Sequence, residues 1–119
     1  MPPTLIRKCP RKPPISERPL LTVEQANELG ELFWILSNDT RLRLLHALMR
    51  AQELCVNELA AEVEMKPQAV SNQLQRLADR GIVGTRRNGT AIHYRIVDPC
   101  VISLLEQGLC LAEDAGSRR

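Results

Sequence analysis

Residues 56–74, VNELAAEVEMKPQAVSNQL, decide the fold of this chain. Apolar residues three and four positions apart predict a short helix from about Val56 to Glu62. Met65 and Lys66 then form a turn, and Pro67 begins a second helix because its missing N–H is not needed at a first helical position. The inner face of this second helix is apolar and comprises Val70, Leu74 and Leu77. Two short helices joined by a tight turn predict a helix-turn-helix.

A β-hairpin is predicted directly after this unit. Gly81 ends the second helix, and apolar and polar residues alternate beyond it, which is the pattern of a strand with one buried face. Ile92, Tyr94 and Ile96 share one side of the second strand. The dipeptide Asn88-Gly89 readily adopts the positive φ angles of a type I′ turn. Because arginines surround this turn, the whole unit is predicted to be a winged helix-turn-helix.

Further helices are predicted on both sides of the winged unit. The spacing of apolar residues indicates a helix over residues 22–37, another over residues 39–51 that Asn38 or Asp39 caps, and a last one over residues 99–113. The predicted fold class is therefore mainly α with a β-hairpin.

Basic residues are concentrated in two parts of the chain. The 119 residues carry a net charge of +2, but residues 1–19 contribute +4 and residues 66–95 contribute +5. Residues 1–19 also hold six of the eight prolines, which excludes a helix there. We divide the chain into a flexible, basic, proline-rich arm (1–20), a winged helix-turn-helix DNA-binding and dimerisation domain (21–114) and a disordered tail (115–119).

Composition excludes several classes of protein. Only Phe33, Trp34 and Tyr94 are aromatic, which argues against a groove that stacks nucleic-acid bases. The sequence shows no apolar stretch of membrane-spanning length and no signal peptide, so we expect a cytoplasmic protein whose four cysteines are thiols. A nucleophile elbow, a phosphate loop and a paired His and Asp are all missing, so we do not expect an enzyme.

The helix that begins at Pro67 is predicted to read DNA. The second helix of a helix-turn-helix enters the major groove, where exposed polar side chains can hydrogen-bond to base edges. A lysine at the helix N-terminus and arginines on the hairpin suit phosphate groups. Any one of these polar residues could serve only to solvate the surface, but the combination favours DNA binding. The expected DNA contacts are Lys66, Gln68, Ser71, Asn72, Gln75, Arg76, Arg86, Arg87 and Arg95.

Together these motifs resemble the ArsR/SmtB metal-responsive transcriptional repressors of bacteria. The resemblance runs from about Leu32 to Glu113 and is carried by LSNDTRLRLL (36–45), ELCVNELA (53–60), AVSNQL (69–74) and the hairpin that ends in Tyr-Arg-Ile. It implies a homodimer built through the first and last helices, a double-stranded operator with an inverted repeat, and derepression when metal binds. Ser71 matches a DNA-contacting serine of the family, whereas Asn72 replaces a histidine that often follows it.

Four cysteines, Cys9, Cys55, Cys100 and Cys110, are the candidate metal ligands. They contain no C-x-x-C pair, so a site has to be assembled by folding or by dimerisation. The resemblance implies one arrangement in which Cys55 is joined by Cys9 of the arm, as in cadmium- and lead-responsive members. Those members tend to have a second cysteine where this chain has Asn57.

A second arrangement uses the last helix. Cys100 and Cys110 are about 15 Å apart along one helix and cannot share an ion, but in an antiparallel pair of helices Cys100 of one chain lies level with Cys110 of the other. Asp98, Cys100 and Asp114 fall at ligand positions of the zinc-responsive members, and Leu111 falls at a fourth, next to Cys110. A mixed site, with Cys55 joining Cys100 or Cys110, is also open.

Thiolate ligands favour soft ions. We therefore expect a repressor that releases its operator on binding mercury, cadmium, lead, or trivalent arsenic or antimony, with zinc and copper(I) less favoured. The alternative is a repressor on the same scaffold that senses thiol oxidation or persulfide. The cysteines could also simply fill space in a core. We expect the two histidines, His46 and His93, to be structural or close to DNA.

Overall fold

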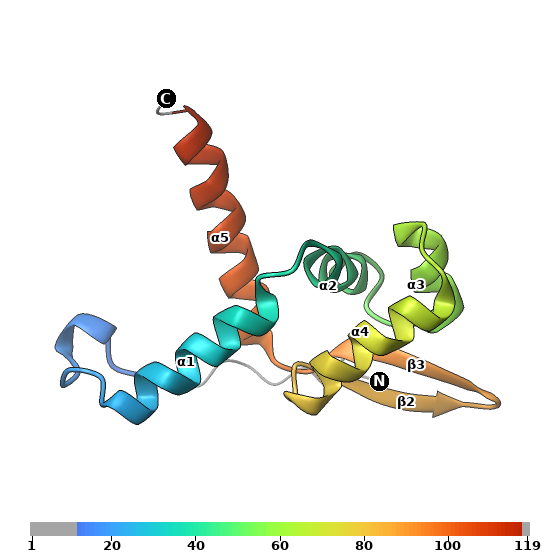
Figure 1. Cartoon of the computed structure of the whole chain (residues 1–119), viewed down its shortest axis with the longest axis horizontal. Coiled ribbons are helices and arrows are strands. Elements are labelled where there is room, and N and C mark those ends of the chain that lie inside the picture. Colours follow the sequence, from blue (N-terminus) through green and yellow to red (C-terminus); the bar gives the residue numbers. More distant parts are fainter. Residues whose placement is uncertain (1–11, 118–119) are drawn as a thin grey trace.

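The computed structural model describes residues 12–117 (Figure 1), so most of the predicted arm, including Cys9, lies outside the described residues. The helices in this range are a short 3₁₀ helix, η1 (Ile15–Glu17), and five α-helices: α1 (Val23–Leu36), α2 (Asp39–Ala51), α3 (Val56–Val63), α4 (Pro67–Asp79) and α5 (Pro99–Ser117). The strands are β1 (Leu54–Cys55), β2 (Val83–Asn88) and β3 (Ala91–Ile96). No helix in the described range is long and apolar enough to cross a membrane.

Local hydrogen bonds set where the first two α-helices begin. Thr22 caps α1 through a reciprocal pair: the Gln25 backbone N–H donates to Thr22 Oγ1 at 3.1 Å, and the Thr22 N–H donates to Gln25 Oε1 at 3.0 Å. Asn38 caps α2, because its Oδ1 accepts the Arg41 N–H at 3.0 Å. The predicted starts of both helices are confirmed.

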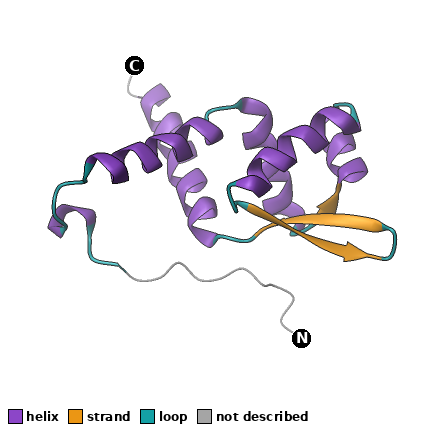
Figure 2. Ribbon diagram, turned by 60° about the horizontal axis from the view of Figure 1, so that its bottom comes forward, coloured by secondary structure: helices purple, strands orange, loops and turns teal. Residues whose placement is uncertain are grey.

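The core lies between α2, α3, α4 and one face of the sheet, and Figure 2 shows the three helices gathered over that face. Its largest fully buried side chains include one or more residues from each of these helices and from β3: Leu44, Leu45, Leu48, Leu59, Val70, Leu74, Leu77 and Ile96. Burial of each such side chain stabilises the fold by roughly 1.5–3 kcal/mol. This packing fixes α4 with its opposite face toward solvent.

The sheet has three strands, in the order β1-β3-β2, and not only the two of the predicted hairpin. Leu54 and Cys55 pair with Tyr94 and His93 of β3 in antiparallel register. The prediction of a hairpin alone was therefore incomplete. A strand of two residues is too short for an alternating pattern to be visible in the sequence. Its consequence is that Cys55 lies on the sheet beside His93.

The last helix is longer than predicted and only its beginning is packed. Asp98 Oδ1 accepts the Cys100 N–H at 2.9 Å at its start, and Val101 is buried. The helix continues to Ser117, into the predicted tail, since a single glycine such as Gly116 costs only about 1 kcal/mol in a helix. Its second half projects away from the body (Figure 1), and Leu109 and Leu111 there are 60% and 63% exposed.

A buried arginine joins three helices. Arg41 of α2 is 6% exposed; its Nη1 donates to the Ile35 carbonyl of α1 at 2.9 Å, and its Nε donates to Gln73 Oε1 of α4 at 2.8 Å. The same guanidinium lies 5.9 Å from the ring centroid of Trp34, within range of a cation–π interaction. Sequence analysis did not single out Arg41, because its partners lie on other helices.

Replacing Arg41 with alanine is expected to lower the free energy of unfolding by about 2–3 kcal/mol, because the buried Ile35 carbonyl and the half-buried Gln73 amide each lose a charged donor. The matched control is Arg43→Ala on the same helix, since Arg43 is exposed and makes only a 3.4 Å contact with the Val63 carbonyl. Urea unfolding at one fixed protein concentration measures both. Equal stability of the two variants would contradict the role given to Arg41.

Candidate nucleic-acid interface

The outward face of α4 is polar along its whole length. Pro67 occupies the first turn, and Lys66 at the N-cap is exposed and makes no side-chain capping bond, so the first N–H groups of α4 and the Lys66 ammonium both face solvent. Such a helix end attracts a phosphate group. Gln68, Asn72, Gln75 and Arg76 follow on the exposed face, and Ser71 is half-buried at its margin.

Hydrogen bonds within α4 order this face without closing it. Gln68 Nε2 donates to Asn72 Oδ1 at 3.1 Å, and Gln75 Nε2 donates to Asp79 Oδ1 at 2.9 Å. Both pairs are exposed and four residues apart, an interaction worth only about 0.2–0.5 kcal/mol. The amide groups can therefore exchange these bonds for bonds to base edges at little cost.

The two arginines of β2, Arg86 and Arg87, are consecutive and so lie on opposite faces of the sheet. In register, Arg87 lies opposite Ile92, and Arg86 lies opposite His93. Arg86 forms an ion pair and a hydrogen bond with Glu53, and His93 Nδ1 is 3.2 Å from Glu53 Oε1. Arg87 is exposed near the tip of the wing. The structure therefore favours Arg87 over Arg86 as a DNA contact.

Arg95 lies nearer the root of the hairpin than its tip. It is half-buried, pairs with Gly84 in the sheet, and its Nε is buried without a hydrogen-bond partner within the described range. This position makes it a weaker candidate than Arg87 for a phosphate contact. DNA binding by Arg86, Arg87 and Arg95, as by the residues of α4, stays a prediction.

Two carboxylates at the base of the wing have altered acidity. The hydrogen bond from Arg86 lowers the pKa of Glu53 below its ordinary value of 4.5, and the charges of Arg86, His93 and Arg95 act in the same direction against partial burial. Glu58 accepts the Cys55 N–H at 2.9 Å, and this bond lowers the pKa of Glu58. Glu53 thus stays ionised and holds Arg86 at neutral pH.

The cysteines are spread over the protomer. Cys55 is half-buried at the start of α3, Cys100 is exposed at the start of α5, and Cys110 is exposed on the projecting half, with its Sγ 3.9 Å from Asp114 Oδ2. Among residues 12–117, no group of three or more His, Cys, Asp or Glu side chains could hold a metal ion. The mixed site of Cys55 with Cys100 or Cys110 is therefore not formed within the described part of one chain.

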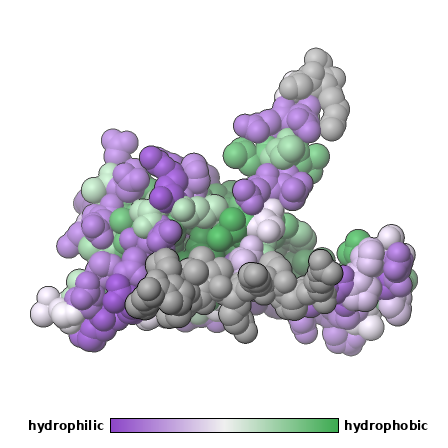
Figure 3. Space-filling view, turned by 180° about the vertical axis from the view of Figure 1, so that it is seen from behind, coloured by the Kyte–Doolittle hydropathy of each residue, from purple (hydrophilic) through white to green (hydrophobic). Residues whose placement is uncertain are grey.

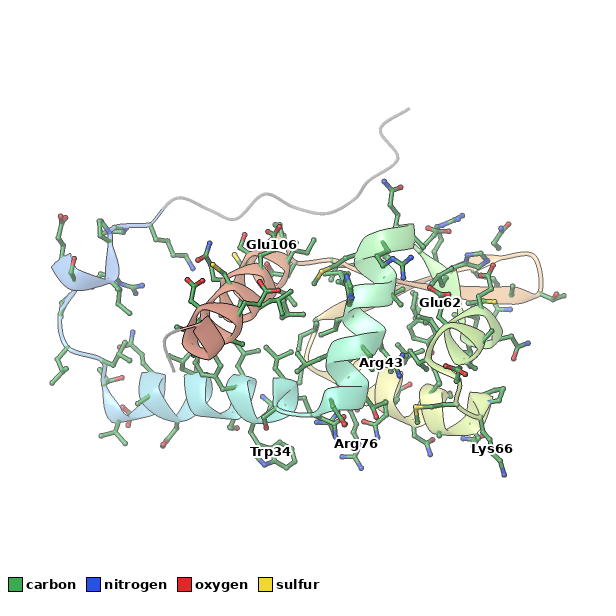
Figure 4. All side chains as sticks on the ribbon, turned by 90° about the horizontal axis from the view of Figure 1, so that it is seen from above. Trp34, Arg43, Glu62, Lys66, Arg76 and Glu106 are labelled. Atoms are coloured by element: carbon green, nitrogen blue, oxygen red, sulfur yellow. The ribbon has the colours of Figure 1, made fainter. Side chains whose placement is uncertain are left out.

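The two histidines have different surroundings. His93 lies against Glu53 at the base of the wing. His46 is exposed and lines a shallow groove between α2 and α3 with Arg43, Arg50 and Glu62. Figure 4 shows Arg43 and Glu62 on the facing sides of these helices.

Sequence analysis missed Glu53. Glu53 reaches Arg86 and His93 only because β1 pairs with β3. The sequence could have indicated this contact only if β1 had been recognised as a third strand.

Comparison with known proteins agrees with this geometry. Residues 38–85 match the family model described as "Bacterial regulatory protein, arsR family". The transcriptional repressor SmtB homolog of Synechocystis sp. is 39% identical over 88 residues, which span 74% of this chain and 66% of that protein. The chain is also similar to the crystal structure of the AntR antimony-specific transcriptional repressor, with 61% identity, a TM-score of 0.77, and coverage of 92% of this chain and 98% of that one.

A further solved structure bears on assembly. It is the homodimeric winged helix-turn-helix DNA-binding domain of Mb0332 from Mycobacterium bovis, a possible ArsR-family regulator, with 29% identity and a TM-score of 0.69 over 84% of this chain and 94% of that one. The predicted winged helix-turn-helix class is confirmed.

The wing arginines are expected to differ in DNA binding. Arg87→Ala should weaken binding to a 30-bp duplex and lower the slope of log affinity against log salt by about 0.9, the loss of one phosphate contact. Arg86→Ala, the matched control, should leave the slope unchanged because Glu53 already occupies its guanidinium. Fluorescence anisotropy of a labelled duplex at several salt concentrations measures this. A larger effect of Arg86→Ala would contradict the assignment.

Acid is expected to weaken the bond between β1 and the wing. Because the folded-state pKa of Glu53 lies below 4.5, its contribution to stability is complete above the unfolded-state pKa and is lost as the pH falls through the folded value. Glu53→Gln imitates the protonated side chain. Urea midpoints should differ between wild type and Glu53→Gln at neutral pH and converge as the pH falls through the folded-state pKa of Glu53. A difference that does not change with pH would contradict this view.

Proposed function

The chain belongs to the ArsR family of bacterial regulatory proteins, and from this premise we propose that it is a homodimeric repressor that leaves its operator when trivalent antimony or arsenic binds cysteine thiolates. The family consists of DNA-binding transcriptional regulators, not enzymes. The observation that carries the proposal is the presence of two exposed cysteines on α5, Cys100 near its start and Cys110 on its projecting half. Cys100 is disulfide-bonded in the structure, contrary to the expectation that all four cysteines are thiols, so the proposed ion-binding form is the reduced protein. The 61% identity to an antimony-specific repressor supports the choice of ion.

Operator binding is assigned to α4 and the wing. Two α4 helices related by a twofold axis reach successive major grooves about 34 Å apart, which matches an inverted repeat. Gln68, Ser71, Asn72 and Gln75 read base edges, while Lys66, Arg76 and Arg87 hold the phosphate backbone.

Exposed apolar surface supports the homodimer. It is concentrated on α1 and on the second half of α5, and Figure 3 shows apolar residues on the projecting helix and on the neighbouring body. Its members include Leu21, Val23, Leu29, Phe33, Leu109 and Leu111, each at least 37% exposed. A patch of this kind marks an interaction site on a protein. A second copy that pairs α1 and α5 would cover it.

The effector site is proposed to form across the dimer. In an antiparallel pair of α5 helices, Cys100 of one protomer lies level with Cys110 of the other, which gives two equivalent thiolate pairs. Trivalent arsenic and antimony suit three sulfur ligands, and we assign the third to Cys9 of the arm. The competing arrangement is a site of Cys55 with Cys9. Cys55 lies at the base of the wing beside His93, away from Cys110 on the projecting half of α5.

The release of DNA follows from a shift between two dimer shapes. An ion that bridges the α5 helices favours the shape in which it is bound, and in that shape the two α4 helices no longer match successive grooves. A coupling of about 1–3 kcal/mol changes DNA affinity roughly 5- to 150-fold. Because coupling is reciprocal, operator DNA weakens ion binding by the same factor.

Operator duplexes selected from a random-sequence pool allow the proposal to be tested by anisotropy under anaerobic conditions. Antimonite and arsenite should release wild type, whereas Cys100→Ser and Cys110→Ser should bind DNA normally and fail to respond. Cys55→Ser is the matched control and should respond like wild type. Release of the Cys100→Ser protein by antimonite would contradict the proposal. Release of the operator by peroxide alone, together with a loss of titratable thiols, would indicate a repressor that senses thiol oxidation.

Mixed dimers separate a site between protomers from one within a protomer. A dimer of one Cys100→Ser and one Cys110→Ser chain keeps Cys100 of the second and Cys110 of the first, so it retains one complete thiolate pair if the site crosses the dimer. A subunit-exchanged mixture should therefore regain response to antimonite that neither parent shows. A mixture as inert as its parents would exclude the proposed pairing.

A further inference from the structure

Trp34, the single tryptophan of the chain, is held in an outward position at the end of α1. It is 64% exposed, although its neighbours Ile35 and Leu36 are 5% and 6% exposed. The Arg41 guanidinium lies 5.9 Å from its ring centroid and is itself fixed by bonds to the Ile35 carbonyl and to Gln73. A large ring supported from below in this way is placed to contact something outside the protomer.

The contacts of α4 locate Trp34 beside the DNA-reading face. Gln73, Arg76 and Arg80 lie along one side of α4 at helical spacing. Gln73 is bonded to Arg41 beneath the ring, and Arg80 lies 3.6 Å from Glu31 of α1. Arg76 lies between these two points and is exposed. The end of α1 therefore runs next to the second half of α4.

Figure 4 shows the same relation directly. Trp34, Arg76 and Lys66 project from the same side of the molecule, and in this view Arg76 lies between Trp34 and Lys66. Lys66 and Arg76 come from the two ends of α4 and both carry positive charge. A polyanion that lies along α4 would meet all three side chains.

We propose that Trp34 and Arg76 together grip the DNA backbone that borders the groove read by α4. This inference rests on the proposed operator binding. The indole Nε1–H, which can only donate, bonds to a phosphate oxygen, and the Arg76 guanidinium supplies the charge. The ring covers the adjacent sugar. The charge of Arg76 favours DNA over a second copy of the chain as the partner. An apolar partner would remove the Arg76 guanidinium from water without supplying an opposite charge.

Trp34 reports on its own contact through fluorescence. Wild type is titrated with a 30-bp random-sequence duplex at about 50 mM salt, where phosphate contacts alone give binding. Tryptophan emission should change in parallel with the anisotropy of the labelled duplex and saturate with it. A rise in anisotropy with unchanged emission would overturn the grip and leave operator binding intact. No rise in anisotropy would defeat both proposals.

Variants test the chemistry of the grip. Trp34→Phe removes the N–H donor and part of the ring that covers the sugar, and should weaken duplex binding about tenfold or more, as for a hydrogen bond to a charged group, with an unchanged salt slope. Arg76→Ala should also weaken binding and lower the slope by about 0.9. Asn27→Ala is the matched control on α1, because Asn27 is exposed, uncharged and outside the apolar surface of the proposed dimer, and it should bind like wild type. Wild-type affinity of the Trp34→Phe variant would overturn the proposal. Trp34 emission that changes with protein concentration in the absence of DNA would also overturn it, because such a change would place Trp34 in the dimer interface.

Discussion

Burial of one apolar row on α4 is the constraint on which the rest of the structure depends. Val70, Leu74 and Leu77 are fully buried against α2, α3 and the sheet. Because a helix is rigid, this burial alone turns the polar row outward and sets its angle to the wing. The hydrophobic effect thus orients a surface whose own hydrogen bonds and charges are too weak to orient it.

Two kinds of contact secure this arrangement at its edges. Arg41 connects α1, α2 and α4 through one buried and one half-buried hydrogen bond, and Glu53, just before β1, connects that strand to the wing through Arg86. In contrast, α1 and the second half of α5 keep apolar side chains in solvent within the protomer. The winged unit is therefore complete by itself, whereas α1 and α5 carry the exposed apolar surface on which the proposed dimer rests. A ligand that acts between those helices can move the two reading faces without unfolding either one.

Sequence predicts the features of this fold that local chemistry determines. The caps at Thr22 and Asn38 and the proline at the start of α4 were correctly placed because each depends on neighbours a few residues away. The strand β1 was missed because two residues carry no period. The ion pair of Arg86 with Glu53 joins residues 33 positions apart, so no local pattern reveals it. The same limit applies to the cysteines, because the proposed site joins residues that are far apart in the sequence and on two protomers.

Sulfur coordination of the bound ion tests the central claim most directly. X-ray absorption at the antimony edge counts the sulfur atoms around the ion in the loaded full-length dimer. We expect a shell of sulfur ligands in wild type that loses sulfur in both Cys100→Ser and Cys110→Ser and is retained in Cys55→Ser. An unchanged sulfur shell in the two α5 variants, or a shell of oxygen and nitrogen alone in wild type, would contradict it.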